Sequence, residues 1–271
     1  MVGQAEDRRG DVILSPLQYA LGAVSGGIVG FMLALAGGGG SILAVPLMVY
    51  VVGVRNPHIA IGTSALAVAA NALAGLANHA RAHNVEWRCG AIYAAAGILG
   101  AFAGSTAGKA FDGQKLLFLF ALVMIAVGAA MILKRGDPGI EGAHCDRENA
   151  PKVVAFGAAT GVFAGFFGIG GGFLIVPGLI ASTHMPILRA VGTSLVAVSA
   201  FGLTTALNYA VSGLVDWPLA IVFSLGGLVG SFAGAKAAAR LSYTKGRLNT
   251  VFAGLIIAVA VYMLWRTAIA V

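Results

Sequence analysis

The sequence predicts an all-α polytopic membrane protein made of two inverted structural repeats, and three observations carry that prediction. The 271 residues are 59% hydrophobic and only 10% charged, with a mean hydropathy of +0.91. Apolar segments of helical length recur along the whole chain, and the second half repeats the motifs of the first half in order. Soluble domains carry about 25% charged residues, so this chain has too little polar surface to fold in water. Lipid is therefore the solvent that we expect around it.

Ten apolar segments follow one another along the chain, at 14–36, 41–53, 59–80, 89–108, 116–133, 153–168, 172–182, 190–211, 218–235 and 248–265. A full membrane crossing takes about 20 residues, so 41–53 and 172–182 are too short to cross upright. Each of these two follows a glycine cluster, 37–40 in one case and 168–172 in the other. We therefore predict that each repeat contains one glycine-broken or re-entrant short helix and three to four long helices.

One long polar stretch, residues 135–152 (RGDPGIEGAHCDRENAPK), divides the chain. The predicted organisation is a first transmembrane repeat over 1–134, a linker over 135–152 and a second transmembrane repeat over 153–271.

The two halves share a series of motifs at an offset of about 130 residues. The matching positions keep their order over most of each half, which indicates an internal duplication. The aligned pairs are Gly39–Pro46 with Gly170–Pro177, Gly62-Thr63-Ser64 with Gly192-Thr193-Ser194, Asn78 with Asn208, Val85-Glu86-Trp87 with Val215-Asp216-Trp217, and Phe102-Ala103-Gly104 with Phe232-Ala233-Gly234.

Counting the crossings predicts the relative orientation of the repeats. If each glycine hairpin returns to its own side, a half crosses three times, and if it crosses fully, five times. Both numbers are odd, so the halves are expected to be inverted; a broken pair that makes a single crossing would instead leave them parallel. Eleven of the 17 Lys and Arg residues fall on the linker's side, which places the linker 135–152 in the cytoplasm by the positive-inside rule. These basic residues are scattered singly between apolar runs, so we expect no nucleic-acid partner.

The glycine clusters are the first candidate for a binding site. A helix that starts inside the bilayer presents unpaired N–H groups and a positive dipole end to an anion. We predict that backbone N–H groups bind a small anion at Gly38, Gly39, Gly40 and Ser41 in one half and at Gly170, Gly171 and Gly172 in the other. The alternative is that these glycines serve only tight helix packing.

Polar side chains near the clusters supply further candidates. The hydroxyls of Thr63, Ser64, Thr193 and Ser194 could donate to the same anion or could cap helix starts. The amides of Asn78 and Asn208 could contact substrate or could bond a neighbouring helix. His79 has Tyr209 as its counterpart, so we interpret it as an interface histidine rather than a proton carrier.

Several kinds of chemistry lack the residues they need. No Asp, Glu, Lys or Arg lies inside a long apolar run, which argues against a cation pump with membrane carboxylates. The chain has no Walker A loop, no zinc-type His cluster and no Ser/His/Asp set with a membrane context, so we expect no cofactor, no metal and no enzymatic activity. Cys89 and Cys145 indicate neither a disulfide framework nor a metal site, and we expect two reduced thiols without a role.

The doubled pattern of a glycine cluster, Leu-x-Val-Pro and Gly-Thr-Ser resembles the sulfite exporter TauE/SafE family, also called the toluene sulfonate uptake permease family. The resemblance covers about residues 15–267. It implies a plasma-membrane transporter of sulfur-containing oxyanions or organosulfur anions such as sulfite, sulfonates, sulfoacetate or thiosulfate. Ser41 stands where the second half has Gly172, so the two halves are expected to be unequal.

The expected function is thus secondary transport, by alternating access, of a small sulfur-containing anion held at the midplane. The expected partners are that anion, the lipid bilayer and, as an open question, a second copy of the chain in a homodimer. A passive anion channel and a thiol-dependent sulfur-relay protein that uses Cys89 or Cys145 stay open as alternatives, as does a non-transporting assembly partner. The sequence does not indicate the direction of transport or the coupling ion.

Overall fold

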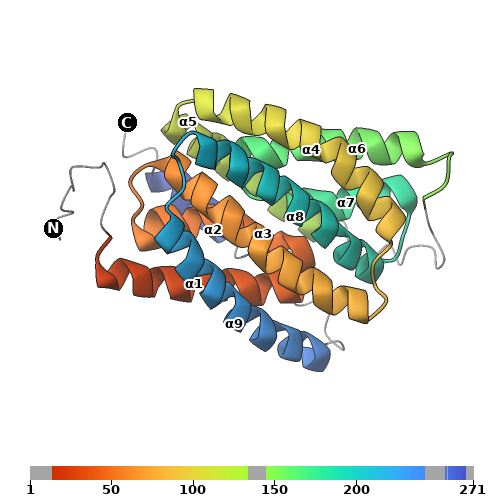
Figure 1. Cartoon of the computed structure of the whole chain (residues 1–271), viewed down its shortest axis with the longest axis horizontal. Helices are drawn as coiled ribbons and strands as arrows, with labels where there is room; N and C mark the ends of the chain where they lie inside the picture. Colours follow the sequence, from red (N-terminus) through yellow and green to blue (C-terminus); the bar gives the residue numbers. More distant parts are fainter. Residues whose placement is uncertain (1–13, 134–144, 242–253, 255, 267–271) are drawn as a thin grey trace.

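The computed structural model describes residues 14–133, 145–241, 254 and 256–266. In this part of the chain the backbone is helical apart from short loops, and it contains no β-strand. Figure 1 shows the helices lying alongside one another, with the connecting loops gathered at the two ends of the bundle. The helical elements in chain order are α1 (Pro16–Ala36), η1 (Gly37–Leu43), α2 (Ala44–Pro46), η2 (Leu47–Val52), α3 (Pro57–Arg81), α4 (Trp87–Ala110), α5 (Gly113–Leu133), α6 (Ala150–Phe167), α7 (Gly172–Thr183), α8 (Ile187–Val211) and α9 (Trp217–Leu241), followed by an apolar helix at Ile256–Arg266.

Seven of the described helices are long and apolar enough to cross a membrane: α1, α3, α4, α5, α6, α8 and α9. The predicted all-α membrane architecture is confirmed, and each predicted long segment that lies in the described part corresponds to one helix. Helix α6 begins at Ala150, inside the predicted linker, and the middle of that linker lies outside the described residues.

The start of α3 illustrates why the helices begin where they do. Pro57 occupies the first turn, where its missing N–H is not needed, and the Asn56 side chain accepts a hydrogen bond from the His58 N–H at 2.9 Å. An asparagine cap followed by proline is a strong helix-start signal.

The first glycine cluster ends α1 and turns the chain back, as predicted. Helix α1 ends at Ala36, Gly37–Leu43 forms a short 3₁₀ segment, and the short apolar helical stretch runs over Gly40–Val52. The cluster packs too closely for a side chain: a Cβ on Gly40 would overlap the backbone of Met32 and Leu33. The chain then doubles back, and at its return the Gln18 side chain donates a hydrogen bond to the Val52 carbonyl at 3.1 Å. Residues 16–52 therefore form a hairpin that begins and ends at the same end of the bundle.

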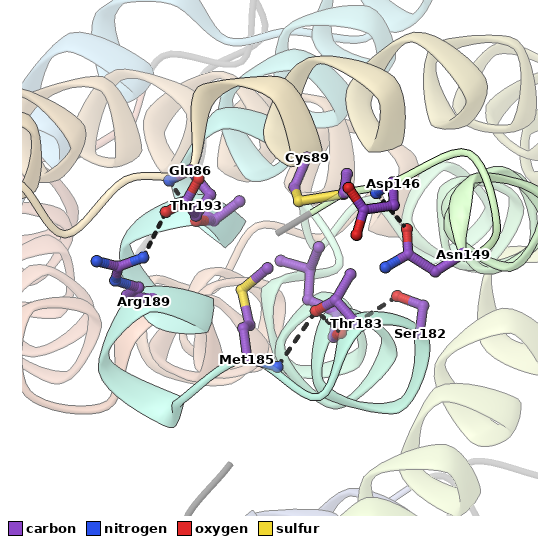
Figure 2. The surroundings of a disulfide bond; sticks show 11 residues. Glu86, Cys89, Asp146, Asn149, Ser182, Thr183, Met185, Arg189 and Thr193 are labelled. Atoms are coloured by element: carbon purple, nitrogen blue, oxygen red, sulfur yellow. Dashed lines mark hydrogen bonds and ion pairs between the residues drawn. A yellow bond between two sulfur atoms is a disulfide. The ribbon is translucent and has the colours of Figure 1, made fainter. Parts of the chain in front are cut away.

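The second glycine cluster also breaks the helix. Gly168, Gly170 and Gly171 adopt left-handed φ angles of 67°, 63° and 68°, which glycine adopts without steric cost. Helix α7 starts at Gly172 as predicted. Figure 2 shows the end of α7, at Ser182 and Thr183, close to the residues that precede α6, so this hairpin also returns to the end at which it began.

Contacts between loops and helix starts define the two ends of the bundle. At what we call the linker end, the α3–α4 loop meets the start of α8, because a Cβ on Gly192 would overlap the Asn84 carbonyl. At the opposite end, the α8–α9 loop meets the start of α3, because a Cβ on Gly62 would overlap the Leu214 carbonyl. The two halves thus make the same contact at opposite ends.

Two glycine-lined helix pairs join the halves, α1 with α9 and α4 with α6; the second pair lies side by side in Figure 1. A Cβ on Gly30 would overlap the Gly227 carbonyl in the first pair, and a Cβ on Gly161 would overlap the Gly97 carbonyl in the second. Small residues let membrane helices approach until their backbones touch. Most of the packing between the halves depends on the close backbone contacts in these two helix pairs.

Cys89 and Cys145 form a disulfide, so the expectation of two reduced thiols is wrong. The two residues are 56 positions apart, but α4 and α5 run out across the bundle and back, which returns the chain to the linker end beside the start of α4 (Figure 2). The sequence offers no sign of this proximity, because it depends on how two helices are connected in space.

Candidate functional site

The described part of the chain contains a small cavity, with a volume of about 40 Å³, between helices of both halves. Helices α1 and α3 supply its walls from the first half, and α8 and α9 supply them from the second. The side chains that matter for its chemistry are Leu33, Asn71, Asn78, His79, Leu195 and Ser231. A site between the repeats is where transporters of duplicated architecture bind substrate.

One face of α3 provides most of the polar lining. Asn71, Gly75, Asn78 and His79 follow a spacing of four, seven and eight residues, which places them on one stripe of the helix. Asn71 lies near the middle of α3 and is fully buried, whereas Asn78 near its end is exposed. The stripe therefore runs from the interior of the bundle towards the linker end.

Two of the polar side chains that line the cavity have atoms with no protein partner among the described residues. Neither the Oδ1 nor the Nδ2 atom of Asn71 makes a hydrogen bond, and neither does Nδ1 of His79. An unsatisfied buried polar group costs about 1–3 kcal/mol, so native proteins pair almost all of them. Unpaired amide atoms in a cavity indicate a place for a bound polar molecule.

The matching place in the other half is filled. The counterpart of Asn71 is Phe201, whose ring stacks on Tyr93 with 6.4 Å between centroids and lies against Gly97. The Asn71 amide lies in the same way against Gly227, the counterpart of Gly97. One half thus has a polar cavity where the other has aromatic packing.

Asn208, the counterpart of Asn78, lies in a closed hydrogen-bond cluster at the opposite end. Lys109 Nζ donates to the Asn208 carbonyl at 2.9 Å, to Asn208 Oδ1 at 2.8 Å and to Ser212 Oγ at 2.8 Å. The Asn208 amide donates in turn to Ser105 Oγ at 2.6 Å and to Thr106 Oγ1 at 3.0 Å. This cluster joins α4 to α8. The structure does not bring Asn78 and Asn208 together.

The predicted threonines lie at the two ends of the bundle and do not line the cavity. Thr63 Oγ1 accepts a hydrogen bond from the Asp216 backbone N–H, and Thr193 Oγ1 accepts one from the Glu86 backbone N–H, both at 2.9 Å. Each threonine thus holds the loop that precedes a helix of the other half. Beside Thr193, Arg189 makes a 2.6 Å ion pair with Glu86 (Figure 2).

The predicted serines donate within their own helices. Ser64 Oγ donates to the Ile61 carbonyl at 3.0 Å, and Ser194 Oγ donates to the Val191 carbonyl at 2.7 Å. Both serines are buried, and these bonds are the helix-internal use of a hydroxyl.

The glycine N–H groups predicted to bind an anion fall into two sets. In the second half, the N–H groups of Gly170 and Gly171 make no hydrogen bond to the described part of the chain, and Gly172 opens α7. Side chains of Val68 and Val198 lie within about 3 Å of the Cβ position of Gly170, so these donors lie in an apolar setting, and their residues do not line the cavity. In the first half, Gly38 and Gly39 belong to the 3₁₀ helix, and Gly40 and Ser41 are buried.

The lining of the cavity decides which ligands it can hold. Amides, a hydroxyl and an imidazole line it, and no carboxylate of the described part of the chain does. Over the described residues, no group of three His, Cys, Asp or Glu side chains is placed to hold a metal ion. Asn71 was not among the predicted site residues; its sequence signal is an amide within an apolar run, seven residues before Asn78.

Known proteins resemble this chain over most of its length. The family described as sulfite exporter TauE/SafE matches residues 22–263. A "Probable membrane transporter protein" of Xylella fastidiosa is 54% identical over 90% of this chain and 94% of its own length. "Probable membrane transporter protein YunE" of Bacillus subtilis is 27% identical over 81% of this chain and 88% of its own length. "Probable membrane transporter protein YdhB", also of Bacillus subtilis, is 29% identical over 77% of this chain and 86% of its own length. No solved structure matches.

Proposed function

Because the chain belongs to the sulfite exporter TauE/SafE family and is a multi-pass plasma-membrane transporter rather than an enzyme, we propose that it carries small sulfur-containing anions by alternating access. The observation that carries the proposal is the cavity between the halves, in which the buried Asn71 amide has no protein partner. A transporter needs such a site inside the membrane, lined by groups that exchange water for substrate.

Alternating access needs two units that can move against each other, and the duplication supplies them. Thr63 and Thr193 make equivalent hydrogen bonds at opposite ends of the bundle, and each glycine hairpin returns to its own end. These contacts support two inverted repeats of three crossings each. Rocking of one repeat on the other would open the cavity to each side in turn.

The two ends of the bundle are arranged differently, and this difference supports alternating access. The stripe from Asn71 to Asn78 runs towards the linker end, whereas the Lys109–Asn208 cluster ties α4 to α8 at the opposite end. In an inverted-repeat transporter, the two ends exchange such arrangements during the cycle. The unpaired N–H groups of Gly170 and Gly171 are further donors that a moving anion could meet.

The test is flux of radiolabelled sulfite and of methanesulfonate into proteoliposomes that contain the purified protein. We expect uptake that saturates with concentration and is absent from protein-free liposomes. Absence of flux for every sulfur-containing anion would overturn the proposal.

The same preparation separates a transporter from a passive anion channel. With an imposed ion gradient, a coupled transporter accumulates substrate above the outside concentration, whereas a pore only equilibrates it. Accumulation is the result that we expect; simple equilibration under every gradient would favour the channel.

A further inference from the structure

We propose that the cavity beside Asn71 is the binding site for a small oxyanion of single negative charge, with the Asn71 amide as its deepest donor. This rests on the proposed transport function and adds the place of the site, its central residue and the class of ligand.

Asn71 is placed so that its amide can bind a ligand. An amide that served only helix packing would hydrogen-bond a neighbouring helix, and this one does not. The side chain is fully buried in the middle of α3, and neither of its polar atoms has a partner in the described structure. The amide lies against the bare backbone of Gly227, so α9 supports one of its faces without offering a hydrogen bond. An Asn side chain offers two N–H donors and one carbonyl acceptor, and a ligand with oxygen atoms can use them.

The cavity's other polar groups favour an anion over a cation. Asn78 adds a second amide, and Ser231 directs its hydroxyl proton to the Leu228 carbonyl at 2.8 Å. His79 adds an imidazole with an unpaired Nδ1 atom. Among the described residues no carboxylate lines the cavity, so a cation would find no compensating charge from them.

The same residues set the charge of the anion. Among the described residues, no lysine or arginine lines the cavity, so His79 is the one side chain there that could carry a positive charge, and the lining offers at most one such charge. A buried ion needs both charge compensation and hydrogen bonds. Hydrogensulfite, a sulfonate or another monoanion meets this condition, whereas a dianion such as sulfate exceeds it.

The size of the cavity sets an upper limit on the ligand. The cavity volume of about 40 Å³ has room for roughly three water-sized groups, since a cavity needs about 10–15 Å³ to hold one water molecule. A compact –SO₃ group fits this space, and an aromatic sulfonate does not. Gly75 keeps the wall open between Asn71 and Asn78, because any side chain there would point towards Leu195 and into the cavity.

The test measures ligand-induced thermal stabilisation of the purified full-length protein at constant ionic strength. The ligands are hydrogensulfite, methanesulfonate, nitrate, sulfate and p-toluenesulfonate. The variants are Asn71→Leu, which fills the cavity, and Asn71→Asp, which keeps the shape and adds negative charge. Thr205→Val is the matched control, since Thr205 is equally buried, has an unpartnered hydroxyl and lies outside the cavity.

We expect hydrogensulfite and methanesulfonate to stabilise the wild type and Thr205→Val, with little effect of sulfate or p-toluenesulfonate. Asn71→Leu and Asn71→Asp should weaken the apparent affinity by about tenfold or more, as expected for the loss of a hydrogen bond to a charged ligand. The unliganded melting temperature of each variant shows that it is folded.

The outcomes separate the site from the function. If the wild type responds and both folded Asn71 variants respond equally well, the cavity is not the site, although sulfur-anion transport stands. If only nitrate stabilises the wild type and the Asn71 variants lose that effect, the site stands and the sulfur substrate fails. If no anion stabilises the wild type, the site proposal is overturned whatever the flux assay gives.

Discussion

Thr63 and Thr193 show how single residues join the two halves. Each hydroxyl accepts a backbone N–H from the loop that precedes a helix of the other half, Asp216 for Thr63 and Glu86 for Thr193. The acidic residues differ in length between the halves, but the bond uses only their backbone. The glycine before each threonine, Gly62 or Gly192, allows the loop carbonyl to come into contact.

We predict that Thr63→Val and Thr193→Val each lower the free energy of unfolding by about 1 kcal/mol, because a partly buried backbone N–H loses its acceptor. Sulfur-anion flux per folded molecule should stay close to wild type. Thermal unfolding in detergent and proteoliposome flux check the two statements. Loss of flux at unchanged stability would instead support the direct substrate contact predicted from the sequence.

The residues of the candidate site were only partly predictable. Positions that both halves share stand out in the sequence, and this led to Asn78, Asn208 and the Gly-Thr-Ser motifs. Asn71 has Phe201 as its counterpart, so nothing repeated marks it. The feature that singles it out is an unpaired amide in a cavity, and this depends on which side chains of α1, α8 and α9 come to face α3.

At the scale of helices, α1 and α9 approach through bare backbone. A Cβ on Gly30 would overlap the Gly227 carbonyl, whereas a Cβ on Gly27 would make only a 3.5 Å contact with the Gly226 carbonyl. Two glycines within one turn of one helix therefore differ sharply in the space around them.

We predict that Gly30→Ala lowers the free energy of unfolding by about 1–3 kcal/mol, as overpacking does, and impairs flux if α1 and α9 separate. Gly27→Ala is the matched control and should be neutral or slightly stabilising, because alanine favours helix by up to about 1 kcal/mol over glycine. Melting temperatures of the two variants, measured side by side, decide the matter. Equal melting temperatures would contradict the close approach.

The helices themselves were predictable because apolar length decides them, and every predicted segment in the described residues is helical. Both glycine clusters interrupt the helices as predicted, but in different ways. In the first half the chain leaves α1 through a 3₁₀ segment and folds back until Gly40 lies against the backbone of Met32 and Leu33. In the second half, Ile169 interrupts the glycines and is fully buried. Three left-handed residues surround it, and the helix breaks there.

At the scale of the whole molecule, the orientation in the membrane follows from charge. The linker side carries eleven of the 17 Lys and Arg residues, so we predict that the linker 135–152 faces the cytoplasm. An epitope inserted after Gly139 should be accessible in inside-out vesicles and protected in intact cells. The reverse accessibility would show that the charge bias does not set the topology.

The disulfide gives a prediction about both stability and mechanism. Replacing Cys89 and Cys145 together by serine should lower the free energy of unfolding by about 2–4 kcal/mol, the usual effect of a lost cross-link. Transport should survive, because neither residue lines the cavity. Loss of flux in a folded double variant would support the thiol-dependent sulfur-relay alternative. A disulfide persists in oxidising compartments and is reduced in the cytoplasm, so a Cys89–Cys145 cross-link found on non-reducing gels of protein from intact cells would contradict the cytoplasmic placement of the linker.

The burial of that disulfide has a chemical consequence if the cargo is sulfite. Sulfite is a nucleophile that cleaves a disulfide into an S-sulfonate and a thiolate, and such attack requires access to one sulfur atom. Cys89 is 0% exposed and Cys145 is 1% exposed, so neither sulfur can be reached from water. A protein that transports sulfite can keep a disulfide near its transport pathway only if both sulfur atoms are buried. In a variant that exposes either sulfur atom, the transported sulfite would cleave the disulfide.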